Sequence, residues 1–197
     1  IGLIIFSSEA FVQCPLTYDQ SALNLFIETL NSRLVPDTGT DFGPALHLAL
    51  DKLNTDDTSI DAKAKIIILI SDGEDFGEET STVRAEIREK GIKLFTLGVG
   101  TTQGSKIMMP DGPKRDQQGN EVISKLDRQS LKELAARTGG SYFEINQRQN
   151  DVSRLINNIN RVEGQLRDAR VVDVSANKYI YFLLAALILL VFDLLTT

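Results

Sequence analysis

The sequence predicts an α/β fold, in which a mainly parallel sheet is flanked by helices, followed by one C-terminal transmembrane helix. Three observations support this prediction. Short apolar runs alternate along the chain with segments whose apolar residues have helical spacing. Residues 66–70 form an unbroken aliphatic run, as expected for a strand that is buried on both faces. Residues 179–195 are almost wholly apolar and follow a polar, charged stretch.

The beginning of the chain predicts two strands and two helices. Residues 2–6 favour a strand because they are mostly aliphatic and β-branched, and residues 10–16 are the candidate for its antiparallel partner. Residues 21–34 place apolar side chains on one helical face. Residues 44–53 predict a second helix with Pro44 in its first turn, where proline is tolerated.

The middle of the chain predicts a strand–helix–strand unit. Residues 66–70 form the first strand, residues 79–90 a polar helix that stops at Gly91, and residues 92–99 a second buried strand. Crossovers of this kind are right-handed and connect parallel strands. We therefore expect these two strands to belong to one parallel sheet.

Residues 101–124 break this alternation and predict a long surface excursion. Turn-forming residues stand among charges here, at Gly104, Pro110, Gly112, Pro113 and Gly119. Their clustering predicts loop structure with a small hairpin around Asp111-Gly112. The length and polarity of the excursion beside the strand ends suggest a recognition surface.

Three further elements are expected after the excursion. Asp127 is a suitable N-cap for a helix over residues 128–138. Residues 141–144 predict a short last strand, and residues 149–166 predict an amphipathic helix with one apolar face.

Composition sets limits on function. The 197 residues are 42% hydrophobic and 24% charged, which suits one core of ordinary size. The net charge is −6 and no basic stripe stands out, which argues against a nucleic-acid partner. Cys14 is the only cysteine, so an internal disulfide is excluded, and we expect it to be a small buried residue. No nucleophile elbow, phosphate-binding loop, dinucleotide fingerprint or zinc spacing is present.

Two loops carry oxygen ligands at the expected carboxyl edge of the sheet. Residues 38–41 lead into a helix, and residues 71–75 directly follow the strand at 66–70. Ligands of parallel α/β sheets bind at this edge, and carboxylate and hydroxyl oxygens suit Mg²⁺, Mn²⁺ or Ca²⁺. We therefore predict a divalent-cation site formed by these two loops.

Neighbouring polar residues leave alternatives open. Glu74 and Asp75 either tune the cation site or solvate a helix start, and the second interpretation is favoured because acidic residues are common near helix N-termini. His47 lies between two leucines of a predicted helix and is expected on the helix surface rather than as a ligand.

Taken in order, the segments resemble a known family. The resemblance is carried by Gly2 to Ala10, Pro15 to Asp19, Gly39 to Leu46, Ile70 to Glu74, and the stretch 104–143. These segments are similar to the von Willebrand factor A-type (VWA) domains of bacterial Bat proteins, which are membrane-anchored and associated with aerotolerance operons. The resemblance implies a Rossmann-like VWA fold in which Thr40 and Asp72 are ligands of a metal-ion-dependent adhesion site.

One family element is missing. The family's Asp-x-Ser-x-Ser loop follows a first strand, whereas this sequence starts at what resembles the second. The resemblance therefore implies an N-terminal truncation, an incomplete metal site, and two neighbouring strands with unpaired backbone groups. The expected organisation is a VWA-type domain over residues 1–166, a juxtamembrane linker over 167–178 and a transmembrane helix over 179–195.

The helix at residues 179–195 would span roughly 25 Å, near the lower limit for a bilayer core. The alternative is a buried core helix, which would usually keep one polar face. Basic residues precede this segment, at Arg161, Arg167, Arg170 and Lys178. The charge rule would place the domain in the cytoplasm, whereas the resemblance implies a periplasmic domain anchored in the bacterial inner membrane.

The expected function is a non-enzymatic, membrane-anchored interaction module. The resemblance implies that a partner's Glu or Asp fills an open position on the cation, and that other Bat-type membrane proteins and a MoxR-type AAA+ ATPase are partners. The first alternative is a metal-free membrane scaffold. The second is a metal-dependent hydrolase using Asp72, which would need further ligands and a general base.

Overall fold

The computed structural model describes residues 1–31, 34–35, 39–54, 64–75, 77, 80–109, 112–115 and 118–162. The chain divides into two compact units, Ile1–Ile159 and Asn160–Thr197, and the first is described below. The predicted linker at 167–178 and transmembrane helix at 179–195 lie outside the described residues. Within the described ranges, no helix has the length and apolar character needed to cross a membrane.

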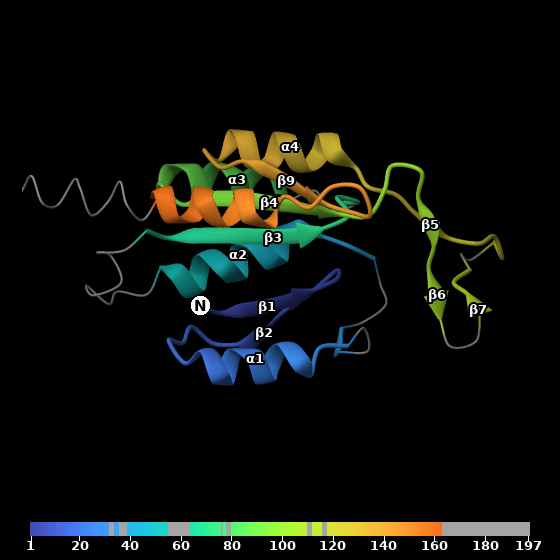
Figure 1. The fold of residues 1–197 in the computed structure, drawn as a ribbon, viewed down its shortest axis with the longest axis horizontal. Coiled ribbons are helices and arrows are strands. Elements are labelled where there is room, and N and C mark those ends of the chain that lie inside the picture. The colour runs from blue at the N-terminus through green and yellow to red at the C-terminus, as the bar shows by residue number, and fades with distance from the viewer. Residues whose placement is uncertain are drawn as a thin grey trace, which may run out of the picture. The chain divides into compact units, whose positions relative to one another are not determined.

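A three-stranded parallel sheet confirms the central prediction of the sequence. Its strands are β3 (Ile66–Ser71), β4 (Lys93–Val99) and β9 (Tyr142–Ile145), in the order β3-β4-β9 (Figure 1). β3 and β4 pair along the full length of β3, from Ile66 opposite Lys93 to Ser71 opposite Gly98. The carboxyl ends of the strands therefore meet at one edge.

The first two strands form a separate sheet. β1 (Leu3–Phe6) and β2 (Ala10–Cys14) pair in antiparallel fashion, as predicted. β2 ends two residues before the predicted limit because Pro15 has no N–H to donate to the ladder. Among the described residues, β1 does not pair with β3, so the β1-β2 pair and the parallel β3-β4-β9 sheet are separate, whereas the fold class predicted from the sequence was one mainly parallel sheet. The resemblance had implied that two neighbouring strands keep unpaired backbone groups.

Two helices on the N-terminal side differ from the predicted ranges. α1 (Gln20–Glu28) is shorter than the predicted 21–34, because the side chains of Thr29 and Asn31 bond to carbonyls of its last turn and cap. α2 (Phe42–Leu53) begins two residues earlier than predicted, because Asp41 caps it by accepting a bond from Gly43 N at 2.8 Å.

The later helices match the sequence more closely. α3 (Thr80–Glu89) is followed by Gly91 at φ +66°, the left-handed conformation expected after a helix. α4 (Arg128–Arg137) is capped by Asp127, whose carboxylate accepts from two backbone amides, as predicted. The predicted last helix is present over residues 152–162, and its continuation to 166 lies outside the described residues.

The excursion contains two short antiparallel pairs, as expected from its turn-forming residues. β5 (Ser105–Lys106) pairs with β8 (Ile123–Ser124). β6 (Met108–Met109) pairs with β7 (Gly112–Pro113), which forms the predicted small hairpin. Figure 1 shows β5, β6 and β7 beyond the carboxyl ends of β3 and β4.

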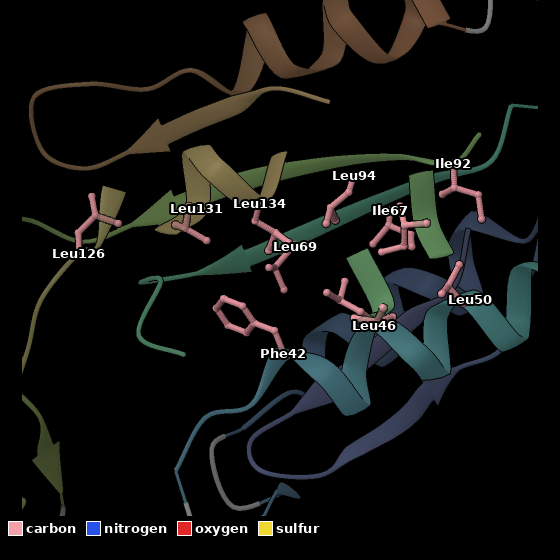
Figure 2. Close-up of a cluster of buried hydrophobic side chains, with 12 residues drawn as sticks. Phe42, Leu46, Leu50, Ile67, Leu69, Ile92, Leu94, Leu126, Leu131 and Leu134 are labelled. Carbon is pink, nitrogen blue, oxygen red and sulfur yellow. The ribbon is translucent and has the colours of Figure 1, made fainter. Parts of the chain in front are cut away.

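The main core lies between one face of the β3-β4 pair and three helices. It consists of Phe42, Leu46, Leu50, Ile67, Leu69, Val83, Ile87, Ile92, Leu94, Leu126, Leu131 and Leu134. Figure 2 shows the apolar side chains of α2 between its helix axis and β3. The ring of Phe6 from β1 packs edge-on against Phe42, with centroids 5.9 Å apart. α2 therefore contacts both the β1-β2 sheet and the parallel sheet. This packing fixes the position of the α2 N-terminus relative to the end of β3.

Candidate metal site at the carboxyl edge of the sheet

The loop that follows β3 has a backbone path that only glycine permits at its second residue. Gly73 has φ +89°, and a Cβ placed on it would lie 2.5 Å from the carbonyl oxygen of Asp127. Ser71 Oγ accepts a bond from Gly73 N at 3.1 Å, which closes the turn. This turn places the Asp72 carboxylate at the end of β3.

The Asp72 carboxylate accepts hydrogen bonds at both oxygens. Oδ1 accepts from Ser71 Oγ and from the amide of Glu74, each at 3.3 Å. Oδ2 accepts from Ser124 Oγ at 2.6 Å, within the range of charge-assisted O–H···O⁻ bonds. A carboxylate oxygen has two lone pairs, so Oδ2 retains acceptor capacity for a cation or for a water bound to it.

The returning end of the excursion lies against this loop, which the sequence did not predict. Besides the Ser124 contact, Lys125 N donates to Glu74 Oε1 at 3.2 Å and Asp127 N donates to the carbonyl of Asp72 at 2.8 Å. Ser124 and Asp72 are 52 positions apart, and no sequence motif joins them. The only sequence signal was that the excursion starts from the same edge of the sheet.

Thr40 lies in the second predicted loop, directly before the N-cap of α2. It is half-buried. The next residue, Asp41, donates its backbone N–H to the carbonyl of Ser7 at 2.9 Å. The structure therefore places Thr40 between the carboxyl end of β1 and the start of α2.

Asp75 joins the two loops. Its Oδ1 accepts from the amides of Phe42 and Gly77, at 3.1 and 3.2 Å, and its Oδ2 accepts from Thr80 Oγ1 at 2.7 Å. Phe42 and Thr80 are the first residues of α2 and α3, so the carboxylate lies where helix N-termini favour negative charge. Asp75 thus has a helix-start role, in agreement with the favoured interpretation, and it also links the loops of Thr40 and Asp72.

A buried hydroxyl lies beside the Thr40 loop. Ser7 Oγ is buried and has no hydrogen-bond partner among the described residues. Buried hydroxyls of this kind are commonly satisfied by a water or an ion. The side-chain oxygens of Ser7, Thr40, Ser71 and Asp72 are hard ligands of the type that Mg²⁺ or Mn²⁺ prefers. No group of three or more His, Cys, Asp or Glu side chains in the described ranges is arranged to hold a metal.

A second polar cluster near the end of β9 was not predicted. Glu144, 3% exposed, accepts four side-chain hydrogen bonds, two from Arg128, one from Tyr142 Oη at 2.8 Å and one from Asn146 Nδ2 at 2.6 Å. The bonds from Arg128 lower the pKa of Glu144, and burial raises the pKa of Tyr142. All four lone-pair positions of this carboxylate are in use, so Glu144 has a structural role.

Two residues outside the site lie where the sequence placed them. His47 is on α2, 43% exposed, with Nδ1 4.0 Å from Glu86 of α3. Cys14 is buried at the end of β2, with Sγ 3.4 Å from the carbonyl of Pro15.

Comparison with known proteins places these features in context. Residues 1–160 match the family model of the von Willebrand factor type A domain. No curated protein matches the chain.

Solved structures give three similar folds. The conserved hypothetical protein BatB from Bacteroides thetaiotaomicron is 26% identical, with a TM-score of 0.73 over 85% of this chain and 78% of that one. An aerotolerance-related membrane protein from Bacteroides fragilis, solved with multiple mutations to serines, is 28% identical, with a TM-score of 0.72 over 81% of this chain and 78% of that one. Proximal thread matrix protein 1 from the mussel byssus, 15% identical with a TM-score of 0.51, covers 84% of this chain and 34% of that one, and shows the fold alone.

Proposed function

Because this chain belongs to the von Willebrand factor type A domain family, as a Bat-type member, we propose that it is a membrane-anchored, non-enzymatic module that binds a protein partner through a divalent cation. The family assignment supports a protein-interaction domain. The cation, the anchor and the partner are the parts of this proposal that experiments must test.

The observation that carries the proposal is the link between two oxygen-rich loops, one after β3 of the parallel sheet and one before α2. The loops of Thr40 and Asp72 are joined by Asp75, which bonds to Phe42 at the start of α2. In the proposed site, the Asp72 carboxylate and the Thr40 hydroxyl hold Mg²⁺ or Mn²⁺, directly or through water. The bound cation supplies the positive charge that attracts a Glu or Asp of the partner.

The arrangement of the acid and base groups favours binding over hydrolysis. A metal-dependent hydrolase needs a general base beside the metal. His47, the single histidine of the sequence, pairs with Glu86 instead of the Asp72 loop. Glu74 and Asp75 are both engaged by backbone amides, which restricts them as proton acceptors.

The proposal includes a place and an assembly. We propose that residues 179–195 anchor the protein in the bacterial inner membrane, with the VWA domain on the periplasmic side. A structurally similar protein from Bacteroides fragilis is described as an aerotolerance-related membrane protein. Other Bat-type membrane proteins and a MoxR-type AAA+ ATPase are the proposed partners, in a role related to oxygen tolerance.

The test has two parts. Calorimetry measures Mg²⁺ binding by the full-length protein, and partners are captured from membrane extract with and without EDTA. The variants are Asp72→Ala, Thr40→Ala and the control Asp51→Ala, which removes an exposed carboxylate on α2 whose side chain is 73% exposed. We expect binding and capture to need the cation, Asp72 and Thr40, and to tolerate the loss of Asp51.

Two results would contradict the proposal. Capture that is indifferent to both EDTA and Asp72→Ala would favour a metal-free membrane scaffold. Metal-dependent turnover of a phosphoester or peptide by the parent protein, lost in Asp72→Ala, would favour the hydrolase.

A further inference from the structure

We propose that Ser124 is a positioning residue for Asp72 and that it couples the excursion, residues 101–124, to the cation. This inference rests on the proposed function, because it assumes that Asp72 holds the cation. It adds a residue and a segment that the VWA motifs do not include.

Ser124 controls how the Asp72 carboxylate is oriented. Of the three hydrogen bonds to this carboxylate, the one from Ser124 Oγ is the shortest, at 2.6 Å, while the other two are 3.3 Å long. Ser124 is also the only one of the three donors that lies outside the turn after β3. Its hydroxyl therefore fixes the rotation of the carboxylate plane, as outer partners of metal ligands commonly do.

Ser124 is itself held in place. Leu126, two residues further on, is 4% exposed within the main core, and its N–H donates to the carbonyl of Thr101 at 3.0 Å. On the other side, Ser124 pairs with Ser105 in the β5-β8 ladder. Because the backbone is held on both sides of Ser124, its hydroxyl keeps its position when the Asp72 loop fluctuates. The hydroxyl of an unanchored loop residue would not.

The excursion can transmit cation binding to the protein surface. Its adjacent residue Lys125 donates to Glu74 Oε1, so two consecutive residues of the return segment bond to carboxylates of the same loop. If the docked excursion holds the carboxylate in the orientation that the cation prefers, docking raises the affinity for the cation. Because coupling between two sites is reciprocal, cation binding then stabilises the docked excursion by the same factor. The excursion displays exposed Met108 and Ile123, so a partner that contacts them would detect the cation.

The experiment uses the full-length protein and Mn²⁺ as the probe. Mn²⁺ affinity is measured by calorimetry for the parent and for Ser124→Ala, Ser124→Thr and Ser105→Ala. Ser105→Ala is the matched control, because Ser105 is an exposed serine directly opposite Ser124 in the ladder. Amide hydrogen exchange at Lys125, measured in EDTA and in Mn²⁺, reports docking of the excursion independently of affinity.

We expect Ser124→Ala to weaken Mn²⁺ binding about tenfold, the lower range for losing an outer partner of a metal ligand. Ser124→Thr, which keeps the hydroxyl, and Ser105→Ala should both bind as the parent does. In EDTA, exchange at Lys125 should be faster in Ser124→Ala than in the parent. In the parent, Mn²⁺ should slow it.

Other outcomes would overturn the coupling in distinguishable ways. Unchanged or tighter Mn²⁺ binding by Ser124→Ala, with binding by the parent still dependent on Asp72, would remove Ser124 from this role and leave the proposed function intact. A parent protein that binds no Mn²⁺ would remove the proposed function and the coupling with it. Exchange of β4 amides serves as the check that each variant is folded.

Discussion

Two carboxylates near the carboxyl edge of the sheet differ in their remaining capacity to accept hydrogen bonds. Glu144 accepts four side-chain bonds and is almost fully buried. Asp72 is half-buried, and one lone pair of its Oδ2 is unused by the bonds that the described residues make. A ligand needs an acceptor with spare capacity, so Asp72 suits cation binding and Glu144 suits a structural link between β9 and α4.

The structural role of Glu144 predicts the effect of removing its charge. In Glu144→Gln, an amide NH₂ would face donors of Arg128, Tyr142 or Asn146, so at least one bond is lost. We expect the free energy of unfolding at pH 7 to fall by about 1–2 kcal/mol, the low end for charged hydrogen bonds because the Arg128 side chain is 42% exposed and screened by solvent. Urea unfolding followed by circular dichroism measures this.

The difference in stability between the parent and Glu144→Gln should also depend on pH. The bonds from Arg128 lower the pKa of Glu144 below its usual 4.5, so the charged form is favoured by folding. The stability difference between the parent and Glu144→Gln should be complete above pH 4.5 and should shrink as the pH falls through the lowered pKa. A difference that stays constant down to pH 2 would show that the charge of Glu144 does not stabilise the fold.

Single residues were predictable where the signal was local. Asp127 was identified as a helix cap from the next few residues, and Asp72 was placed at the carboxyl end of a parallel strand because it directly follows an apolar run. The Ser124 contact to Asp72 was not predictable, because it joins positions 52 apart and depends on how the excursion folds back. Whether Thr40 and Asp72 bind a cation stays a prediction.

At the scale of elements, the turn between β3 and α3 connects most of the candidate site. The turn requires glycine at position 73 for two separate reasons. Its φ of +89° disfavours any side chain, and the space that a Cβ would occupy is taken by the carbonyl of Asp127. The first cost is one of backbone conformation and the second is one of packing, so matched glycines can separate them.

Gly73→Ala and Gly119→Ala form that matched pair. Gly119 has a similar φ of +85°, but a Cβ there would meet no atom within 4 Å. We expect Gly119→Ala to destabilise the protein by about 1 kcal/mol from backbone strain, and Gly73→Ala by about 3 kcal/mol because overpacking is added. Equal losses in urea unfolding would mean that the turn shifts to admit the methyl group.

Elements were predicted well in type and less well in extent. The strands at 66–70 and 92–99 were found within one residue of their predicted limits, because their apolar runs are continuous. The first helix stops at Glu28 rather than 34, although apolar residues continue at helical spacing, because Thr29 and Asn31 offer the backbone other hydrogen bonds. The spacing of apolar residues alone does not reveal that side-chain hydrogen bonds compete with the helix.

At the scale of the molecule, α2 lies between the β1-β2 sheet and the three-stranded parallel sheet. The fold class followed from the alternation of strands and helices. The pattern of a single strand does not show which strands pair, so unpaired neighbouring strands were implied only by the family resemblance. α2 bridges these two sheets, and the contact between Phe6 and Phe42 is part of that bridge.

Phe42→Ala should therefore act differently on the two sheets. Phe42 is fully buried, so we expect the free energy of unfolding to fall by about 3–5 kcal/mol. Hydrogen exchange should accelerate more for the amides of β1 and β2 than for those of β3 and β4. The control is Phe95→Ala, which removes a buried ring on β4 that packs on Phe143, and it should not single out β1 and β2.

The excursion has a consequence for how freely this protein can vary in length. Its two ends are held together, because Leu126 N donates a hydrogen bond to the carbonyl of Thr101 and the Leu126 side chain lies in the core. Closing a longer loop costs only about 0.6 kcal/mol for each doubling. Residues inserted after Gly119 would thus lower the melting temperature only slightly, which makes the tip of the excursion a suitable site for a reporter group or for new binding sequences.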